Sequence, residues 1–442
     1  MGLTIRDHMR IKGRTTGFDY IRVALATCII FWHAISISYG TNFEIAYWRG
    51  PMGVAMHFVL PMFFALSGFL VAGSLDRCPT LVSFFAMRVL RIVPALAVEV
   101  TLSALIFGPI LTSFSLGDYF SDPRFRHYFL NILGEPHFFL PGMFEHNPVK
   151  NVVNAQLWTI PYELQSYLTL GCLAAATILR RRSFLLVIVL VGQAIWIWEA
   201  IKHGDNGGGG GASGPVLVLC FLVGLLFHLY RDVIRLHWTI FLMSLVVGAA
   251  GSALPYGAYY LPIPATYVTV YLGLLSPRMI RLVSSGDYSY GLFLYGVPLQ
   301  QAVASYGPEA RHWWVNVAVA FPASLLVAVL SWHIIERPAL AMRRYLPAIE
   351  ARLVRLVSGR PAVSGLGVGC GMESVPLGSW WGVIAGCGML AGVAGTLLLL
   401  NMNQLPAALM ILVSFLAAIS LTRRGTVQGL GAVDVSSTRS VR

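Results

Sequence analysis

The stretch IRVALATCIIFWHAISISYG, residues 21–40, decides the fold, because it is long and apolar enough to cross a lipid bilayer. It nevertheless carries Arg22 and His33, and an ionisable side chain is costly inside a membrane. Eleven helical residues turn the chain by about 1100°, so the two side chains share one face, about 16 Å apart along the axis. Arg22 then lies at a membrane edge, and His33 lies within the span, where such a residue usually faces a cavity or a partner.

The composition of the whole chain is typical of a membrane protein. Of the 442 residues, 57% are hydrophobic and 11% are charged, whereas soluble proteins carry about 25% charged residues. Further apolar runs of spanning length lie near residues 53–74, 92–113, 155–179, 183–201, 214–230, 238–253, 258–276, 288–305 and 313–335, with another pair near 378–400 and 404–421. We therefore expect an all-α polytopic membrane protein with a ten-span core and a two-span C-terminal hairpin.

The lysines and arginines predict the orientation of these spans. With the N-terminus in the cytoplasm, 25 of the 31 basic residues fall in inner segments and six in outer ones, as the positive-inside rule requires. An even number of spans then places both termini in the cytoplasm. Topology thus accounts for the net charge of +12, and we expect no nucleic-acid partner. The first run lacks a signal-peptide cleavage site, so we expect it to stay as the first span.

Three regions follow from these patterns. Residues 1–345 form the ten-span domain, residues 346–376 a cytoplasmic basic stretch with a Gly/Ser-rich linker, and residues 377–442 a two-span appendix with a tail. The appendix has almost no ionisable residues, so we expect the chemistry in the first region. The six cysteines show no CxxC or Cys/His ligand spacing, so neither a metal site nor a disulfide framework is predicted.

Further ionisable side chains lie in or beside the expected spans. Arg88 and Arg91 share a helix face at the inner end of the third span, where they could grip a phosphate or simply anchor the helix. Glu163, in QLWTIPYELQSY, lies near the expected depth of His33 and could fix the tautomer of its imidazole. Glu99 is another buried acid, which could pair with one of the arginines.

Four more side chains could support a site. Asp19 precedes Arg22 by three residues and could orient its guanidinium. Trp158 is either an interfacial aromatic residue or part of the site wall. Ser67, followed by a glycine in FFALSGF, suits close helix packing better than it suits an acyl-serine. Glu336 stands beside Arg337 and is expected to close a structural ion pair with it.

Six short motifs, in this order and spacing, resemble the acyltransferase-3 family of membrane acyltransferases, which acylate exported sugars, O-antigens and other acceptors. They are GFDYIRVALATCIIFWHA at 17–34, FFALSGFLVAGSL at 63–75, RVLRIVP at 88–94, LWTIPYE at 157–163, DYSYGLFLYGVP at 287–298 and IERP at 335–338. The resemblance covers about three-quarters of the chain. One position departs from the family, because Gly296 stands where the late motif usually carries a histidine. His333 could supply an imidazole in its place.

The resemblance implies an enzyme of the bacterial inner membrane. It would move an acyl group, most simply acetyl, from cytoplasmic acyl-CoA to a hydroxyl of an exported carbohydrate or lipid-linked glycan. The residues expected to bind the coenzyme are Arg22, Arg88, Arg91, Ser289 and Tyr290.

In this interpretation His33, supported by Glu163, takes the proton from the attacking hydroxyl, or else carries the acyl group itself. We favour direct attack, because nothing in the sequence indicates a covalent intermediate. The alternative is a proton-coupled secondary transporter with the same two residues as a relay. No inverted repeat between the halves supports that alternative. A scaffold without chemistry would leave both residues unexplained.

Overall fold

The computed structural model describes residues 2–13, 15–78, 80–204 and 213–350. This part of the chain is helical, and its few β-contacts are isolated bridges rather than strands. The expected two-span appendix at 377–442, and the linker beyond residue 350, lie outside the described residues.

Each of the ten stretches expected to span the membrane contains a major helix. These helices are α2 (Gly17–Tyr39), α5 (Val59–Leu75), α6 (Leu81–Leu102), α10 (Ile160–Ala175), α11 (Arg182–His203), α12 (Gly214–Leu229), α13 (Trp238–Ser252), α14 (Pro262–Gly273), α16 (Ser289–Ala304) and α17 (Trp313–Ser331). Five continuous helical segments are long and apolar enough to cross a membrane: Gly17–Tyr39, Met52–Leu75, Leu81–Leu111, Arg182–His203 and Trp313–Glu350. The chain is therefore a helical membrane protein.

The helix α6 begins eleven residues before the apolar run that predicted it. Its N-cap is Thr80, whose hydroxyl accepts a hydrogen bond from the Ser83 amide at 3.1 Å, a strong start signal. The segment continues through the π-helix η1 (Ser103–Phe107) into α7 (Gly108–Leu111). Because of the early start, Arg88 and Arg91 lie inside the helix rather than at its end.

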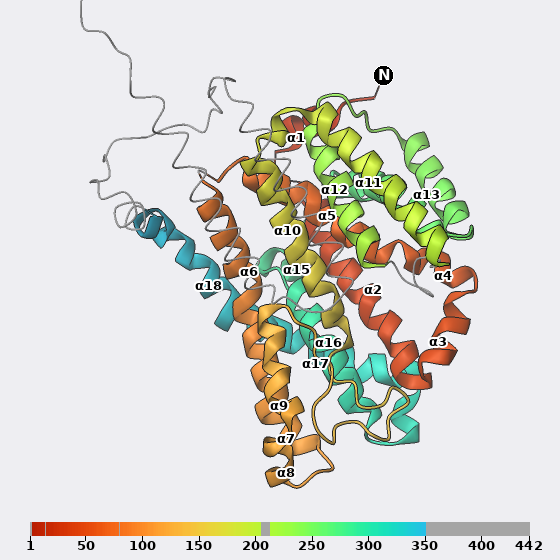
Figure 1. Cartoon of the computed structure of the whole chain (residues 1–442), viewed down its shortest axis with the longest axis vertical. Helices are drawn as coiled ribbons and strands as arrows, with labels where there is room; N and C mark the ends of the chain where they lie inside the picture. The colour runs from red at the N-terminus through yellow and green to blue at the C-terminus, as the bar shows by residue number, and fades with distance from the viewer. Residues whose placement is uncertain (1, 14, 79, 205–212, 351–442) are drawn as a thin grey trace, which may run out of the picture.

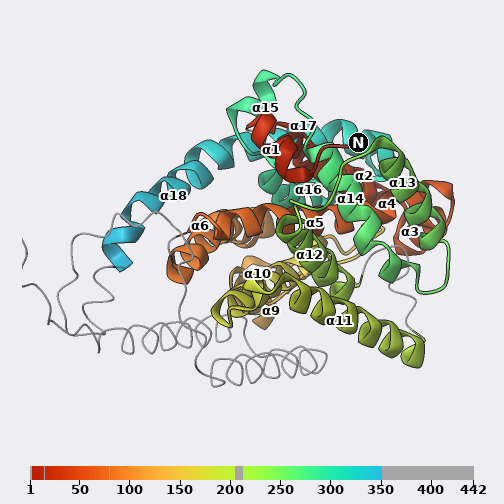
Figure 2. The ribbon, with the colours of Figure 1, turned by 90° about the horizontal axis from the view of Figure 1, so that it is seen from above.

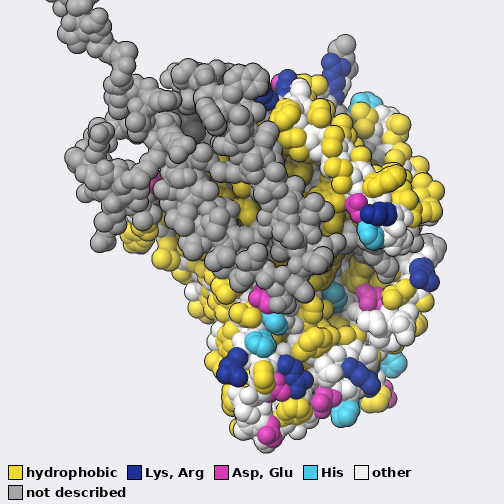
Figure 3. Space-filling model, viewed as in Figure 1, with side chains coloured by type: hydrophobic (Ala, Val, Ile, Leu, Met, Phe, Trp, Pro, Cys, Tyr) yellow, Lys and Arg dark blue, Asp and Glu magenta, His cyan; other side chains and the backbone are white. Residues whose placement is uncertain are grey.

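The helices form one bundle whose two ends differ (Figure 1). The short helix α1 (Ile5–Lys12) lies at one end, and α7, α8 (Leu116–Ser121) and α9 (Pro123–Tyr128) lie at the opposite end. We call these the α1 end and the α9 end. Charged and histidine side chains gather at the α9 end on the face shown in Figure 3. In both ribbon views the segment that begins at α18 (Arg337–Ala341) leans away from the bundle (Figures 1 and 2).

The centre of the bundle is the pair α5 and α12, which pack against each other more extensively than any other two described helices. Gly68 and Gly224 permit this approach. A Cβ on Gly68 would stand 1.9 Å from the Phe221 carbonyl oxygen, and one on Gly224 would stand 2.2 Å from the Ala65 oxygen. Small residues at such crossings are typical of membrane helices, so the packing role expected for the FFALSGF motif is confirmed at Gly68.

The outer face of α11 is apolar and exposed. Its exposed side chains include Val187, Leu190, Val191, Ile195 and Trp198. Exposed aliphatic rows of this kind suit contact with lipid rather than water. The helix packs on α12 at the edge of the bundle (Figures 1 and 2).

Candidate active site

A cavity of about 510 Å³ lies among α2, α5, α6, α10 and α16. Apolar side chains form much of its wall, and its polar and charged lining is Thr15, Asp19, Arg22, Ser67, Ser74, Arg77, Arg88, Arg91, Thr159, Glu163, Tyr167, Ser289 and Tyr290. Most of the candidate residues chosen from sequence are therefore in one place. Among the described residues, no group of three or more His, Cys, Asp or Glu side chains is arranged to hold a metal ion.

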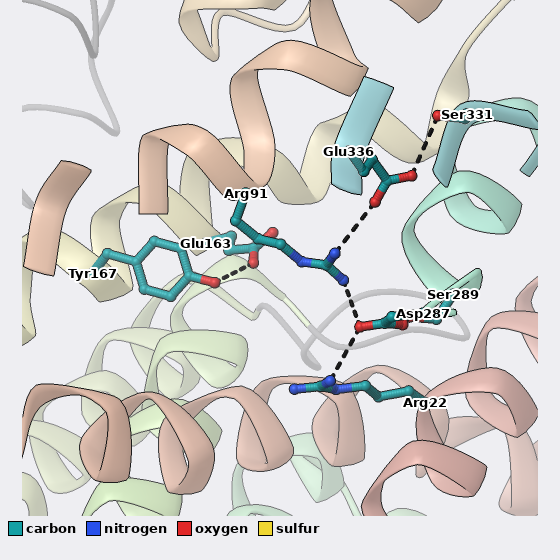
Figure 4. A network of polar contacts seen from close by, with 8 residues as sticks. All are labelled: Arg22, Arg91, Glu163, Tyr167, Asp287, Ser289, Ser331 and Glu336. Carbon is teal, nitrogen blue, oxygen red and sulfur yellow. Dashed lines mark hydrogen bonds and ion pairs between the residues drawn. The ribbon is translucent and has the colours of Figure 1, made fainter. Parts of the chain in front are cut away.

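Two of the cavity arginines share one carboxylate (Figure 4). Arg22 Nη1 lies 3.1 Å from Asp287 Oδ2, and Arg91 Nη2 lies 2.6 Å from the same oxygen. Ser289 Oγ donates to the other oxygen, Oδ1, at 2.6 Å. Asp287 precedes α16, outside the membrane-spanning segments. Burial alone would raise its pKa, but the charges of Arg91 and Arg22 lower that pKa to about 2.

Glu336 extends this network to the π-helix η7 (Trp332–Glu336). Its Oε2 lies 3.2 Å from Arg91 Nη1, and its Oε1 accepts a hydrogen bond from Ser331 Oγ at 3.2 Å. The expected ion pair between Glu336 and Arg337 is thus wrong, because the buried partner of Glu336 is Arg91. The network Arg22–Asp287–Arg91–Glu336 joins α2, α6, the start of α16 and the end of α17.

Arg88 has a different environment from Arg91. Its Nη2 donates to Ser74 Oγ at 3.1 Å, and its guanidinium lies over the Phe84 and Tyr167 rings, 5.8 and 5.7 Å from their centroids. Its Nε is buried without a hydrogen-bond partner among the described residues. No carboxylate in that part of the chain forms an ion pair with Arg88. This arginine is therefore oriented by neutral groups, and Glu163 acts on it only through a longer-range charge interaction.

Glu163 faces the cavity rather than His33. Its carboxylate accepts a hydrogen bond from the Tyr167 hydroxyl, one turn further along α10 (Figure 4). That hydroxyl also lies 3.5 Å from Ser67 Oγ. Within the described residues, the expected contact between Glu163 and the His33 ring is absent. The i,i+4 neighbour on its own helix was the closer partner.

His33 lies just beyond the cavity. The last residue of α2 that lines the cavity is Ile29, and His33 follows it by four residues, about 6 Å along the same helix face. His33 is partly exposed. Arg22 and His33 therefore mark two levels of one helix face, as their spacing predicted, with the cavity at the level of Arg22.

Glu99 is fully buried nearer the α9 end, away from the arginines. Its Oε1 accepts hydrogen bonds from Ser103 Oγ at 2.6 Å and from Asn154 Nδ2, which also contacts the Tyr128 hydroxyl. The expected pairing of Glu99 with an arginine is wrong. An amide and a hydroxyl, rather than a cation, bind Glu99 Oε1, and its Oε2 is buried without a hydrogen-bond partner among the described residues.

The supporting residues have partners of their own. Asp19 lines the cavity, but the carboxylate that Arg22 contacts belongs to Asp287. Tyr290 donates its hydroxyl to the Ile92 carbonyl at 3.0 Å, and its ring lies under the Arg91 guanidinium. Trp158 packs edge-on against Tyr162, 5.9 Å between ring centroids, and does not line the cavity.

Gly296 stands where the family usually has a histidine, and the side chain of Ile30 packs beside it. A Cβ on Gly296 would stand 3.1 Å from Ile30 Cγ1, so α2 fills the space beside this glycine. His333 is exposed and packs edge-on against Tyr288, 6.3 Å between ring centroids. It does not line the cavity, so it does not replace the absent imidazole there.

Sequence reasoning missed three residues of this cavity. Asp287 opens the motif DYSYGLFLYGVP but was not singled out as a partner for the arginines. Tyr167 stands one helical turn after Glu163, a spacing that could have revealed the pair. Arg77 lies in the short connection after α5 and was counted only as a topology signal.

Comparison with known proteins identifies the class. A family model described as an acyltransferase domain matches residues 15–333. Nodulation protein 10 of Rhizobium leguminosarum bv. viciae is 27% identical over 369 residues, 76% of this chain and 96% of its own. The O-acetyl transferase of Shigella phage Sf6 is 25% identical over 336 residues, 72% of this chain and 94% of its own. No solved structure matches.

The family match contains the four cavity arginines, Asp287 and His33, and it covers well over half of the chain. The chain is accordingly an acyltransferase of a non-aminoacyl type, and it belongs to the acyltransferase-3 family.

Proposed function

We propose that this protein is a membrane O-acetyltransferase that uses cytoplasmic acetyl-CoA and acylates a hydroxyl of an exported carbohydrate or lipid-linked glycan. The observation that carries the proposal is the cavity, which gathers four arginines and ends one helical turn short of His33. The relative named O-acetyl transferase supports the acetyl group and the oxygen acceptor. Membership of an acyltransferase family favours this enzyme over the proton-coupled transporter.

The proposal includes an orientation in the bacterial inner membrane. We assign ten spans, with both termini and the α1 end of the bundle in the cytoplasm. The distribution of lysine and arginine over alternate connections supports this orientation. The arginine cavity then opens toward the cytoplasm, where acyl-CoA is made, and His33 and the α9 end face the outside.

The arginines provide the reason for a coenzyme A donor. The coenzyme carries a diphosphate and a 3′-phosphate, and guanidinium groups bind phosphate through paired, charge-assisted hydrogen bonds. Arg22, Arg77, Arg88 and Arg91 together give the cavity a positive potential that attracts such a ligand. Ser289 and Tyr290 line the same wall and support the bound coenzyme.

The proposed acyl transfer uses the two levels that Arg22 and His33 mark along α2. The thioester lies at the far end of the cavity from the solvent-exposed Arg77, toward Ile29 and His33. His33 accepts the proton of the acceptor hydroxyl, whose oxygen attacks the thioester carbonyl carbon. A C–O bond forms, the C–S bond breaks, and the proton passes from His33 to the departing thiolate. Glu163, paired with Tyr167, serves the donor side of this reaction as a polar group of the cavity wall.

The test is binding and transfer with labelled acetyl-CoA. The purified chain in detergent should bind acetyl-CoA, and inverted membrane vesicles that contain it should transfer label to the glycan fraction. Arg88→Ala should weaken binding increasingly with added salt, whereas Arg180→Ala, which removes an exposed arginine outside the cavity, should not. If the folded wild-type protein bound no acetyl-CoA, the donor assignment would be wrong.

A further inference from the structure

Arg77 is the solvent-exposed arginine of the cavity. It follows Asp76, the C-cap of α5, and it is exposed to solvent while lining the cavity. Its side chain forms no hydrogen bond or ion pair with any of the residues that the structure describes. The neighbouring Asp76 carboxylate is held elsewhere, by His228 Nε2 at 2.9 Å and Arg231 Nη2 at 3.4 Å.

Arg77 and Arg88 approach the same turn of α5. Arg88 Nη2 donates to Ser74 Oγ at 3.1 Å. Arg77 Nη1 lies 3.5 Å from the point where a Cβ on Gly73 would stand. The two guanidiniums therefore flank adjacent residues of one helix, and His228 Cε1, 3.1 Å from the same point, fills the space beside Gly73.

The four cavity arginines divide into two pairs by their partners. Arg22 and Arg91 contact Asp287 and Glu336, so this pair is neutralised by two carboxylates. Arg77 and Arg88 form no ion pair or hydrogen bond with a carboxylate in the described part of the chain, and Asp76 and Glu163 act on them only through longer-range charge interactions. An incoming anion can bind the second pair without displacing a bound carboxylate, which costs less free energy.

We propose that Arg77 and Arg88 form the phosphate subsite of the donor, with Arg88 on the diphosphate and Arg77 on the 3′-phosphate of coenzyme A. This rests on the proposed function, and it deepens it by assigning separate phosphates to separate arginines. Arg22 and Arg91 then hold the helices together and add to the field, while Asp287 and Glu336 remain their direct partners.

The order of groups along α5 supports this assignment. The cavity wall runs along this helix from Leu60 to Ser74 and ends at Arg77, a distance of about 25 Å at 1.5 Å per residue. Leu60 and Ile29 line the part of the wall beyond the arginines, and His33 follows Ile29. In acetyl-CoA the thioester and the 3′-phosphate lie at opposite ends, with the diphosphate between them. A thioester directed toward Ile29 places the diphosphate near Arg88 and the 3′-phosphate near Arg77.

The experiment compares two ligands that differ in one phosphate. The full chain, purified in detergent, is titrated calorimetrically with acetyl-CoA and with acetyl-3′-dephospho-CoA. Arg77→Ala should lower the affinity for acetyl-CoA about tenfold or more and leave the affinity for the dephospho ligand unchanged. Arg77→Lys, which keeps the charge, should lose less. Arg88→Ala should weaken both ligands, and Arg180→Ala neither.

Each other outcome overturns a stated part of the proposal. An equal loss of both ligands in Arg77→Ala would show that this residue does not contact the 3′-phosphate, and that it acts on a shared group or on lipid. Wild-type affinity of Arg77→Ala for both ligands would remove Arg77 from the subsite. Failure of the folded wild-type protein to bind either ligand would instead refute coenzyme A as the donor, and the subsite with it.

Discussion

Replacement of Asp287 by asparagine tests the network that holds four helices together. The carboxylate accepts from Arg22, Arg91 and Ser289 at 3.1, 2.6 and 2.6 Å. An amide of the same shape loses the charge and presents an NH₂ group to the arginine donors. The lowering of the Asp287 pKa from 3.8 to about 2 corresponds to about 2 kcal/mol in favour of the folded, charged state. Asp287→Asn should lose this contribution.

The assay is thermal unfolding of the purified protein in detergent. A loss of about 2 kcal/mol should lower Tm by about 2 °C in a chain of 442 residues. The matched control is Asp232→Asn, which removes the partner of Arg182 in a more exposed pair, with 42% and 31% of the two side chains exposed. That pair should contribute less than about 1 kcal/mol. Equal Tm values for Asp287→Asn and Asp232→Asn would refute the structural role of the network.

The pH dependence of this difference has a defined sign. The folded-state pKa of Asp287 is lowered, so its contribution is fully present above about pH 4 and disappears as pH falls toward 2. The Tm difference between Asp287→Asn and wild type should therefore be constant from pH 8 to pH 5 and shrink below pH 4. A difference that disappeared between pH 7 and pH 5 would point to another titrating group.

Three further replacements test separate parts of the molecule. His33→Ala should abolish acetyl transfer in a single-turnover assay. Because His33 lies beyond the cavity, the Kd for acetyl-CoA should change by less than about threefold. Full turnover would contradict the role of His33 as the base. Tyr167→Phe removes the hydroxyl bonded to Glu163 in the donor wall and should lower the affinity for acetyl-CoA by up to about tenfold; an unchanged affinity would show that the pair is dispensable. Gly68→Val places a side chain 1.9 Å from the Phe221 carbonyl oxygen and should abolish the folded peak in gel filtration. Gly192→Val, which meets nothing within 4 Å, should not, and equal yields would contradict the close α5–α12 packing.

The helices were predictable because a bilayer imposes a length and a polarity on each span. A run of about 20 apolar residues has few alternatives to a membrane helix, and a helix occupies each of the ten expected stretches. The start of α6 was misplaced because Arg88 and Arg91 were assigned to a membrane edge. In the structure Thr80 caps this helix, and both arginines point into a polar cavity rather than toward solvent.

The members of the site were easier to predict than their partners. Helical spacing is local, so it correctly grouped Arg88 with Arg91 on a face that lines the cavity. The partner of Arg22 is 265 residues away in the sequence, in a connection that no periodicity describes. Depth along a helix suggested a contact between Glu163 and His33, but equal depth does not fix which faces meet. The same limit applies to Glu99, whose amide partner Asn154 comes from the long segment before η3 (Ala155–Thr159).

The division of the arginines also changes how mutants of the RVLRIVP motif should be interpreted. Arg91 holds Asp287 and Glu336, so its removal leaves a buried carboxylate without its cation, which is strongly destabilising. Arg88 has neutral partners, and its removal leaves no such charge behind. Arg88→Ala should therefore lose coenzyme affinity at nearly unchanged Tm, whereas Arg91→Ala should lose Tm first. A double replacement would combine the two losses, so only the single variants, measured for both Kd and Tm, separate donor binding from the integrity of the bundle.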